Sequence, residues 1–220
     1  MSAVKNCRII LIAFFVLAVS SYAVADVQVV KIPHVDDVYP ELIDWRGKIV
    51  LHIGDSHVAA GLTAGFRKEL RAAGAFYRPR GWVGSRSKSW IASGRFRRLL
   101  EKITPHIVIV TLGTNVMTEP HPERQISWVK TIAKKVGTRR CFWLGPPPLL
   151  EDKHSYNQIL KDSCTPCRYF DTRQLGFKMH ADKKFHLTRK QGERWAAQAW
   201  RWMNGQKVEP LSTQDIDNAL

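Results

Sequence analysis

The chain has 220 residues, of which 45% are hydrophobic and 24% charged, and its formal net charge is +15. This composition excludes an intrinsically disordered chain, and the length suits a single domain with a sizeable core. The excess of positive charge favours an anionic partner, with a solubilising surface as the alternative interpretation.

The first 25 residues have the pattern of a secretory signal. Lys5 and Arg8 precede an apolar stretch at residues 9–19, and residues 23–25 (Ala-Val-Ala) form a small-x-small cleavage site. An uncleaved anchor is the alternative, but the apolar stretch is short for a membrane span. We therefore expect an exported protein, periplasmic or secreted, without stable membrane insertion after cleavage.

A buried strand and a sharp turn are expected next, at residues 48–53. The β-branched run that ends at Ile53 has no helical period, and Gly54 allows the backbone to turn. Helical spacing then extends from about residue 58 to residue 73. Ser56 therefore lies at the sheet edge where open α/β proteins bind ligands, although Ser is also an ordinary helix cap.

The segment that follows is rich in glycine and positive charge. We expect a short strand at residues 75–78, a Gly/Ser/Arg loop at 79–93 and a helix at 94–103. From residue 67 to residue 102 there are eleven Lys or Arg residues and two acids. A field of this strength favours an anionic partner, and nucleic acid is not expected for an exported protein.

The second half of the chain alternates strands and helices. The clearest strand signal is residues 107–112, which ends just before Asn115. Further expected elements are helices at 123–136 and 153–162, strands at 141–144 and 168–171, and a final helix that starts at a Thr188–Gln191 capping box. This alternation predicts a three-layer αβα fold with a mostly parallel five-stranded sheet. The domain would span residues 48–204, between a lead-in at 26–47 and a polar tail at 205–220.

Three cysteines remain after removal of the signal, which contains Cys7. In an oxidising compartment we expect Cys164 and Cys167 to form a small loop-stapling disulfide. A redox motif is the weaker interpretation, because this pair does not open a helix after a first strand, and a zinc site would need two more ligands at matching spacing. Cys141 lies in an apolar run and is expected to be a buried thiol.

Four polar features follow strand ends in chain order: Ser56, Gly84, Asn115, and His186 just before the last helix. A serine hydroxyl needs a base to become a nucleophile, and histidine is the usual base. Backbone amides at Ser56 and Gly84 and the side-chain amide of Asn115 are suitable oxyanion donors. Each residue alone is more often structural, but their order along one sheet edge indicates a serine-nucleophile site.

This pattern resembles the SGNH (GDSL-type) hydrolase superfamily, from about Lys48 to Trp202. The matching blocks are Gly54-Asp55-Ser56, Gly81-x-x-Gly84, Leu112-Gly113-x-Asn115 and His186. The resemblance implies a flavodoxin-like fold, with Ser56 as nucleophile and His186 as base. It also implies an oxyanion hole made by Ser56 N–H, Gly84 N–H and the Asn115 side chain.

The sequence departs from the family pattern at two positions. The acid usually found three residues before the histidine is replaced by Lys183, which cannot accept a hydrogen bond. Asp182, one residue earlier, is expected to orient His186, with Asp171 as the alternative. His57 after the nucleophile is similar to a variant found in bacterial polysaccharide O-acetyl esterases and transferases. It is expected to contact substrate or cap the helix rather than act as the base.

The resemblance implies an exported serine esterase that acts without metal or cofactor. Its expected substrates are acyl esters, in the first place O-acetyl esters, of a cell-envelope or extracellular polysaccharide. Arg86 and Lys88, shortly after Gly84, are candidates to hold anionic sugar groups. A lipase, thioesterase or acyltransferase on the same scaffold is the enzymatic alternative. A catalytically inactive binding protein is the alternative from another class.

Overall fold

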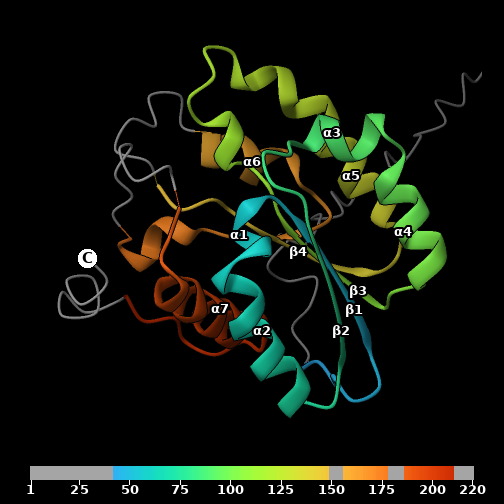
Figure 1. The fold of residues 1–220 in the computed structure, drawn as a ribbon, viewed down its shortest axis with the longest axis vertical. Coiled ribbons are helices and arrows are strands. Elements are labelled where there is room, and N and C mark those ends of the chain that lie inside the picture. Colours follow the sequence, from blue (N-terminus) through green and yellow to red (C-terminus); the bar gives the residue numbers. More distant parts are fainter. Residues whose placement is uncertain (1–41, 149–155, 178–185, 211–220) are drawn as a thin grey trace, which may run out of the picture. The chain divides into compact units, whose positions relative to one another are not determined.

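Five parallel strands form the centre of the structure, in the order β2-β1-β3-β4-β5 (Figure 1). The computed structural model of the chain describes residues 42–148, 156–177 and 186–210. The strands are β1 (Ile49–Gly54), β2 (Phe76–Gly81), β3 (Ile107–Thr111), β4 (Arg140–Leu144) and β5 (Arg168–Phe170). The central strand β3 is buried along its whole length, as expected for a sheet covered on both faces.

Helices cover both faces of this sheet. They are α1 (Ser56–Ala59), α2 (Gly61–Ala72), α3 (Ser87–Ala92), α4 (Arg95–Ile103), α5 (Ile126–Val136), α6 (Tyr156–Ser163) and α7 (Arg189–Met203). α2 and α7 pack side by side on one face, whereas α3, α4 and α5 pack together on the other (Figure 1). The predicted three-layer fold with a parallel five-stranded sheet is therefore confirmed, and the strand order is the flavodoxin-like one.

Small residues allow α2 and α7 to pack closely. A Cβ atom at Gly61 would lie 2.5 Å from the carbonyl oxygen of Arg189, and one at Gly65 would lie 2.5 Å from Cβ of Ala196. Neither position can therefore hold a larger residue without moving the helices apart. The close approach places the start of α7, and with it His186, beside the start of α2.

Two helical segments differ from the sequence expectation. The helix expected at 58–73 is divided at Ala60 into α1 and α2, and α3 lies within the expected loop at 79–93. α3 is held by its fully buried Trp90, whose indole N–H donates to the Ser85 hydroxyl at 2.9 Å. Burial of one aromatic side chain thus stabilises a short helix that local composition does not favour.

The expected Cys164–Cys167 disulfide is wrong. The disulfide joins Cys141 to Cys167, and the buried thiol is that of Cys164. The reason is the register of β4 and β5, in which Phe142 lies opposite Arg168. The residue before each of these is a cysteine, so the two sulfur atoms meet across neighbouring strands with a Cα–Cα distance of 4.4 Å.

Removal of this disulfide is expected to destabilise the fold. The bridge joins residues 26 positions apart, and closing a loop of that size contributes about 3 kcal/mol in the chain-entropy model. The Cys141→Ala/Cys167→Ala variant should therefore unfold at lower denaturant concentration than the wild type, and its midpoint should not respond to reductant. Cys164→Ala is the matched control, and its midpoint should still fall in reductant. A midpoint of Cys164→Ala that ignores reductant would contradict the pairing.

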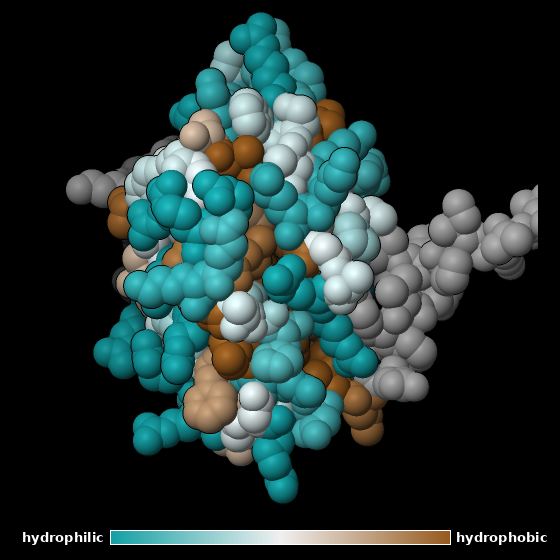
Figure 2. All heavy atoms as spheres, turned by 90° about the vertical axis from the view of Figure 1, so that its right-hand side faces the viewer, coloured by the Kyte–Doolittle hydropathy of each residue, from teal (hydrophilic) through white to brown (hydrophobic). Residues whose placement is uncertain are grey.

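The side of the molecule on which α4 lies is largely hydrophilic, with hydrophobic side chains visible in a band between polar ones (Figure 2). Arg97 and Arg98 of α4 are exposed, and Arg97 pairs with Glu101 at 3.0 Å. Within the described residues, no helix combines the length and apolar character needed to cross a membrane.

Candidate active site

Ser56 lies at the junction of β1 and α1. β1 ends at Gly54, and Ser56 is the first residue of α1. Asp55 caps this helix, because its Oδ1 atom accepts a hydrogen bond of 3.0 Å from the backbone N–H of His57. The Ser56 side chain is thereby held at the carboxyl edge of the sheet, with 9% of its surface exposed.

Hydrogen bonds connect the β1 end to the glycine loop and to Asn115. The Gly54 carbonyl accepts from Trp82 N–H at 2.9 Å and from the Ser85 hydroxyl at 3.5 Å. The Asn115 side-chain amide donates to the Ser85 carbonyl at 3.0 Å. Three of the four predicted site residues therefore belong to loops that contact one another, with Ser85 as the common partner.

Several donors at this junction remain available to a ligand. Among the described residues, the backbone N–H groups of Ser56 and Gly84 donate no hydrogen bond. Gly84 is exposed, and its φ of +72° is accessible to glycine without strain. Asn115 uses one of its two side-chain N–H groups on Ser85, which leaves the other. These are the donors that an oxyanion would need.

His186 lies close to the same junction. It is exposed and immediately precedes the capping box of α7, in which Thr188 accepts from Gln191 N–H at 3.2 Å. The centre of its ring is 5.9 Å from that of His57, the neighbour of Ser56 in the chain. The start of α7 thus brings the predicted base to the residue next to the predicted nucleophile.

His57 lies behind His186. It is 4% exposed, and its ring packs edge-on against Trp195 of α7 at 5.5 Å. Burial and, to a lesser extent, the charge of His186 lower the pKa of His57 to about 3. A neutral ring held at this position is a weak base at neutral pH. Because the ring is buried, it is poorly placed to contact a substrate directly.

The group that orients His186 is not found among the described residues. Asp182, the predicted partner, lies outside them. The alternative, Asp171, does not contact His186, because both of its carboxylate oxygens bind the Arg173 guanidinium at 2.6–3.1 Å. Asp171 instead caps the short 3-10 helix at Thr172–Leu175.

Arg86 and Lys88 follow the glycine loop at the start of α3. Both are exposed, and Arg86 pairs with Glu119 at 2.5 Å. Lys88 has no carboxylate partner among the described residues. The two cations thus follow Gly84 closely in the chain. The positive charge of Lys88 is not neutralised by a described carboxylate and could pair with an anionic group of a ligand.

Asp55 is an unusual carboxyl group, since it is fully buried beside Ser56. Burial raises its pKa to about 7, although the hydrogen bond from the His57 amide opposes the shift. Its hydrogen bond to the turn suits a structural role, because it defines the backbone on which Ser56 is placed.

His52 forms a polar link inside the sheet that the sequence interpretation missed. Its Nδ1 lies 2.7 Å from the Tyr77 hydroxyl and its Nε2 lies 2.9 Å from the Thr111 hydroxyl. It therefore joins β2, β1 and β3 inside the sheet. The available signal was its position within an otherwise apolar strand run, which is typical of a buried and hydrogen-bonded histidine.

These buried groups predict an unusual dependence of stability on pH. Burial lowers the pKa values of His52 and His57 to about 3, so between about pH 4.5 and 5.5 they take up protons only when the chain unfolds. Asp55 acts in the opposite direction, because its raised pKa keeps a proton in the folded state alone. The unfolded chain thus binds two protons at the histidines, whereas the folded chain binds one at Asp55. The difference of one proton gives the free energy of unfolding a slope of about 1.4 kcal/mol per pH unit, so stability falls as the pH falls through this window.

The His52→Gln variant tests this account by denaturant unfolding at several pH values. It removes one of the two histidines, so the slope between about pH 4.5 and 5.5 should fall close to zero, while stability at pH 7 decreases. His121→Gln is the matched control, since His121 is exposed and should leave the wild-type slope unchanged. An unaltered slope in His52→Gln would contradict the assignment.

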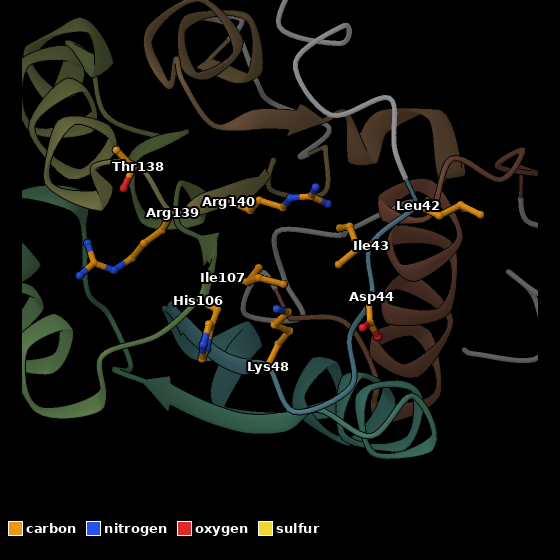
Figure 3. Close-up of a pocket in the computed structure, with 9 residues that line it drawn as sticks. All are labelled: Leu42, Ile43, Asp44, Lys48, His106, Ile107, Thr138, Arg139 and Arg140. Atoms are coloured by element: carbon orange, nitrogen blue, oxygen red, sulfur yellow. The ribbon is translucent and has the colours of Figure 1, made fainter.

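A separate hollow of about 510 Å³ lies at the opposite edge of the sheet, where β1, β3 and β4 begin (Figure 3). Its charged lining residues serve the fold. The Arg139 guanidinium donates to the carbonyls of Pro105 and Val136, and His106 Nδ1 accepts from the Ile49 N–H at 3.1 Å. Parallel strands separate this hollow from the Ser56 edge, so it does not belong to the candidate site.

Among the described residues, no group of three or more His, Cys, Asp or Glu side chains is arranged to hold a metal ion. The polar groups at the Ser56 edge are a hydroxyl, an imidazole and amide donors. This set matches acyl transfer through a serine nucleophile.

Solved structures of hydrolases have the same fold. The acetylxylan esterase Axe2 of Geobacillus stearothermophilus, in one of its variants, aligns with a TM-score of 0.60 and 14% identity over 76% of this chain and 98% of that chain. LAE5, an α/β hydrolase from the metagenome of Lake Arreo in Spain, aligns at 0.55 and 17% identity over 74% and 98%. The psychrotrophic esterase EstA of Pseudoalteromonas sp. aligns at 0.53 and 18% identity over 71% and 99%.

The chain has the fold of these hydrolases. No protein-family model matches the sequence, and no curated protein matches it either. The likeness at this level of identity therefore concerns the backbone architecture, and the chemistry rests on the site residues themselves.

Proposed function

We propose that this protein is an exported serine esterase of the SGNH type. The observation that carries the proposal is the convergence of the loops around Ser56, Gly84, Asn115 and His186 at one sheet edge. The hydrogen bonds through Ser85 and the approach of the His186 ring to His57 support it. The fold that the chain shares with esterases is consistent with this reaction class.

In the proposed reaction, the Ser56 hydroxyl attacks the carbonyl carbon of an ester while His186 accepts its proton. The developing oxyanion receives hydrogen bonds from the Ser56 and Gly84 amides and the Asn115 side chain. His186 then returns the proton to the leaving alcohol, which departs and leaves an acyl-Ser56 ester. Water attacks that ester with His186 as base, releasing the acid and restoring Ser56. Asp182 is proposed to orient His186, and the chemistry requires no metal or cofactor.

The proposed substrate is a small acyl ester, such as acetyl, on a cell-envelope or extracellular polysaccharide. The acetylxylan esterase among the structural neighbours acts on a substrate of this kind. The Cys141–Cys167 disulfide supports an oxidising, extracytoplasmic location. Arg86 and Lys88 are proposed to bind anionic groups of the polymer near the glycine loop.

Acetate release by the purified chain tests the proposal, with 4-nitrophenyl acetate and an acetylated polysaccharide as substrates. Turnover of both is expected. The same reactions with added acceptor sugars distinguish hydrolysis from transfer, because transfer would yield acetylated acceptor in place of free acetate. Absence of turnover on every ester would overturn the enzymatic proposal and favour a binding protein.

A further inference from the structure

Three adjoining hollows follow the outer side of α2, and Arg67 lines all of them. The first, of about 360 Å³, is also lined by residues 59–61, Thr63, Ala64 and Arg189. The second, of about 500 Å³, adds Lys68 and Arg71, and the third, of about 380 Å³, reaches Arg78 on β2. We call this series of hollows, lined by these residues, the α2 groove.

The α2 groove carries uncompensated positive charge. Its lining contains five cationic side chains and neither Asp nor Glu. Arg189 pairs with Glu193 at 3.0 Å, but the other four form no ion pair with any described residue. Two other exposed arginines are paired, Arg97 with Glu101 and Arg86 with Glu119. The potential along the groove is therefore attractive to anions.

The shape of the α2 groove suits an extended ligand. Its floor between the cationic side chains consists of small residues, among them Ala60, Gly61 and Ala64. Arg67 and Arg71 lie one helical turn apart on the same face of α2. At 1.5 Å per residue, α2 from Gly61 to Arg71 spans about 15 Å, which allows several negative groups in a row.

One end of the α2 groove opens beside the candidate active site. The first hollow is lined by Ala59, the last residue of the helix that begins with Ser56, and by Arg189, three positions after His186. A chain lying in the groove would thus continue toward the Ser56 edge of the sheet.

We propose that the α2 groove binds a linear anionic polysaccharide and presents its acylated residues to Ser56. Binding follows from the charge and shape of the groove, while presentation to Ser56 rests on the proposed function. A membrane surface fits less well, because interfacial binding inserts several apolar side chains. Of the large exposed hydrophobic side chains in the described ranges, Phe76 is the one that lines the groove.

Binding of polygalacturonate, a linear polycarboxylated glycan, tests the groove by calorimetric titration at low and high salt. The Arg67→Gln/Arg71→Gln/Arg78→Gln variant should bind at least about tenfold more weakly at low salt, and the wild-type affinity should fall as salt screens the charges. The matched control is Lys130→Gln/Lys134→Gln/Lys135→Gln on α5, which removes the same charge from another exposed face and should retain wild-type affinity.

Three results would overturn the proposal that the α2 groove binds an anionic polysaccharide. These are equal loss of affinity in both triple variants, no binding of polygalacturonate by the wild type, or binding to phosphatidylglycerol vesicles with none to the glycan. The last result would assign the surface to a membrane.

A catalytic measurement separates the groove from the proposed function. The groove variant should hydrolyse 4-nitrophenyl acetate like the wild type but release acetate more slowly from acetylated polygalacturonate. Glycan binding through the groove without hydrolysis of any ester would refute the proposed function, and the proposal that the groove binds an anionic glycan would stand. If the groove variant hydrolyses each of the two substrates as fast as the wild type does, the groove's part in catalysis is refuted.

Discussion

Replacement of Ser56 by alanine is expected to lower kcat for 4-nitrophenyl acetate on the order of 10⁴-fold or more, because it removes the hydroxyl that is proposed to form the acyl-enzyme. The Ser56 side chain is 9% exposed, so the smaller alanine fits without crowding its neighbours. Stability should change little, since the Asp55 cap and the hydrogen bonds of the Gly54 carbonyl involve other atoms. The measurement is the rate of nitrophenolate release by equal amounts of folded protein.

Ser127→Ala is the matched control for this experiment. Ser127 is exposed on α5, on the opposite face of the sheet from α2 and α7, and its loss should leave the rate unchanged. Full activity in Ser56→Ala, with the same unfolding midpoint as the wild type, would show that another residue is the nucleophile.

Exchange of His186 for asparagine is expected to lower kcat by about 10³-fold or more, because the Ser56 hydroxyl then has no base to accept its proton. His186 is exposed, so the fold should tolerate the change. The steady-state rates of the variant on 4-nitrophenyl acetate, normalised to folded protein, give the loss.

His57→Asn is the neighbouring comparison, since the two rings lie 5.9 Å apart. Burial holds the pKa of His57 at about 3, which makes it a poor base at neutral pH, so its activity loss should be much smaller. The change removes the packing against Trp195 and should lower stability instead. A greater loss of kcat in folded His57→Asn than in His186→Asn would reverse the assignment of the base.

Much of the fold follows from local patterns. The apolar runs at β1, β3 and β4 predict buried strands because a strand covered on both faces needs no polar face. The final helix is evident from the Thr188–Gln191 capping box, whose two hydrogen bonds are formed as expected. α3 could not be predicted in this way, because its stability comes from the burial of Trp90 and not from the Gly/Ser/Arg composition around it.

The candidate site was also accessible in outline from the sequence. Ser56, Gly84, Asn115 and His186 are recognisable because each follows or precedes a predicted element, and parallel strands bring their carboxyl ends to one edge. Ser85 was missed, although it bonds to both Gly54 and Asn115, because an ordinary serine in a loop gives no local signal.

Cysteine pairing shows where local reasoning fails. The short spacing of Cys164 and Cys167 suggests a small loop, but the distance between sulfur atoms depends on how β4 lies beside β5. That register places Cys141 next to Cys167, and it arises from the packing of the entire sheet. The same holds for His52, whose partners Tyr77 and Thr111 come from two neighbouring strands.

The amino-acid pattern was thus sufficient for the class of fold and for the order of most of its elements, and it predicted Ser56, Gly84, Asn115 and His186 as site residues. These properties depend on periodicity, turns and caps, which act over a few residues. The disulfide, the buried polar link at His52, the position of His57 behind His186 and the α2 groove emerge only after folding. Each depends on distances between residues far apart in the chain, and those distances are set by strand register and by the close packing of α2 against α7.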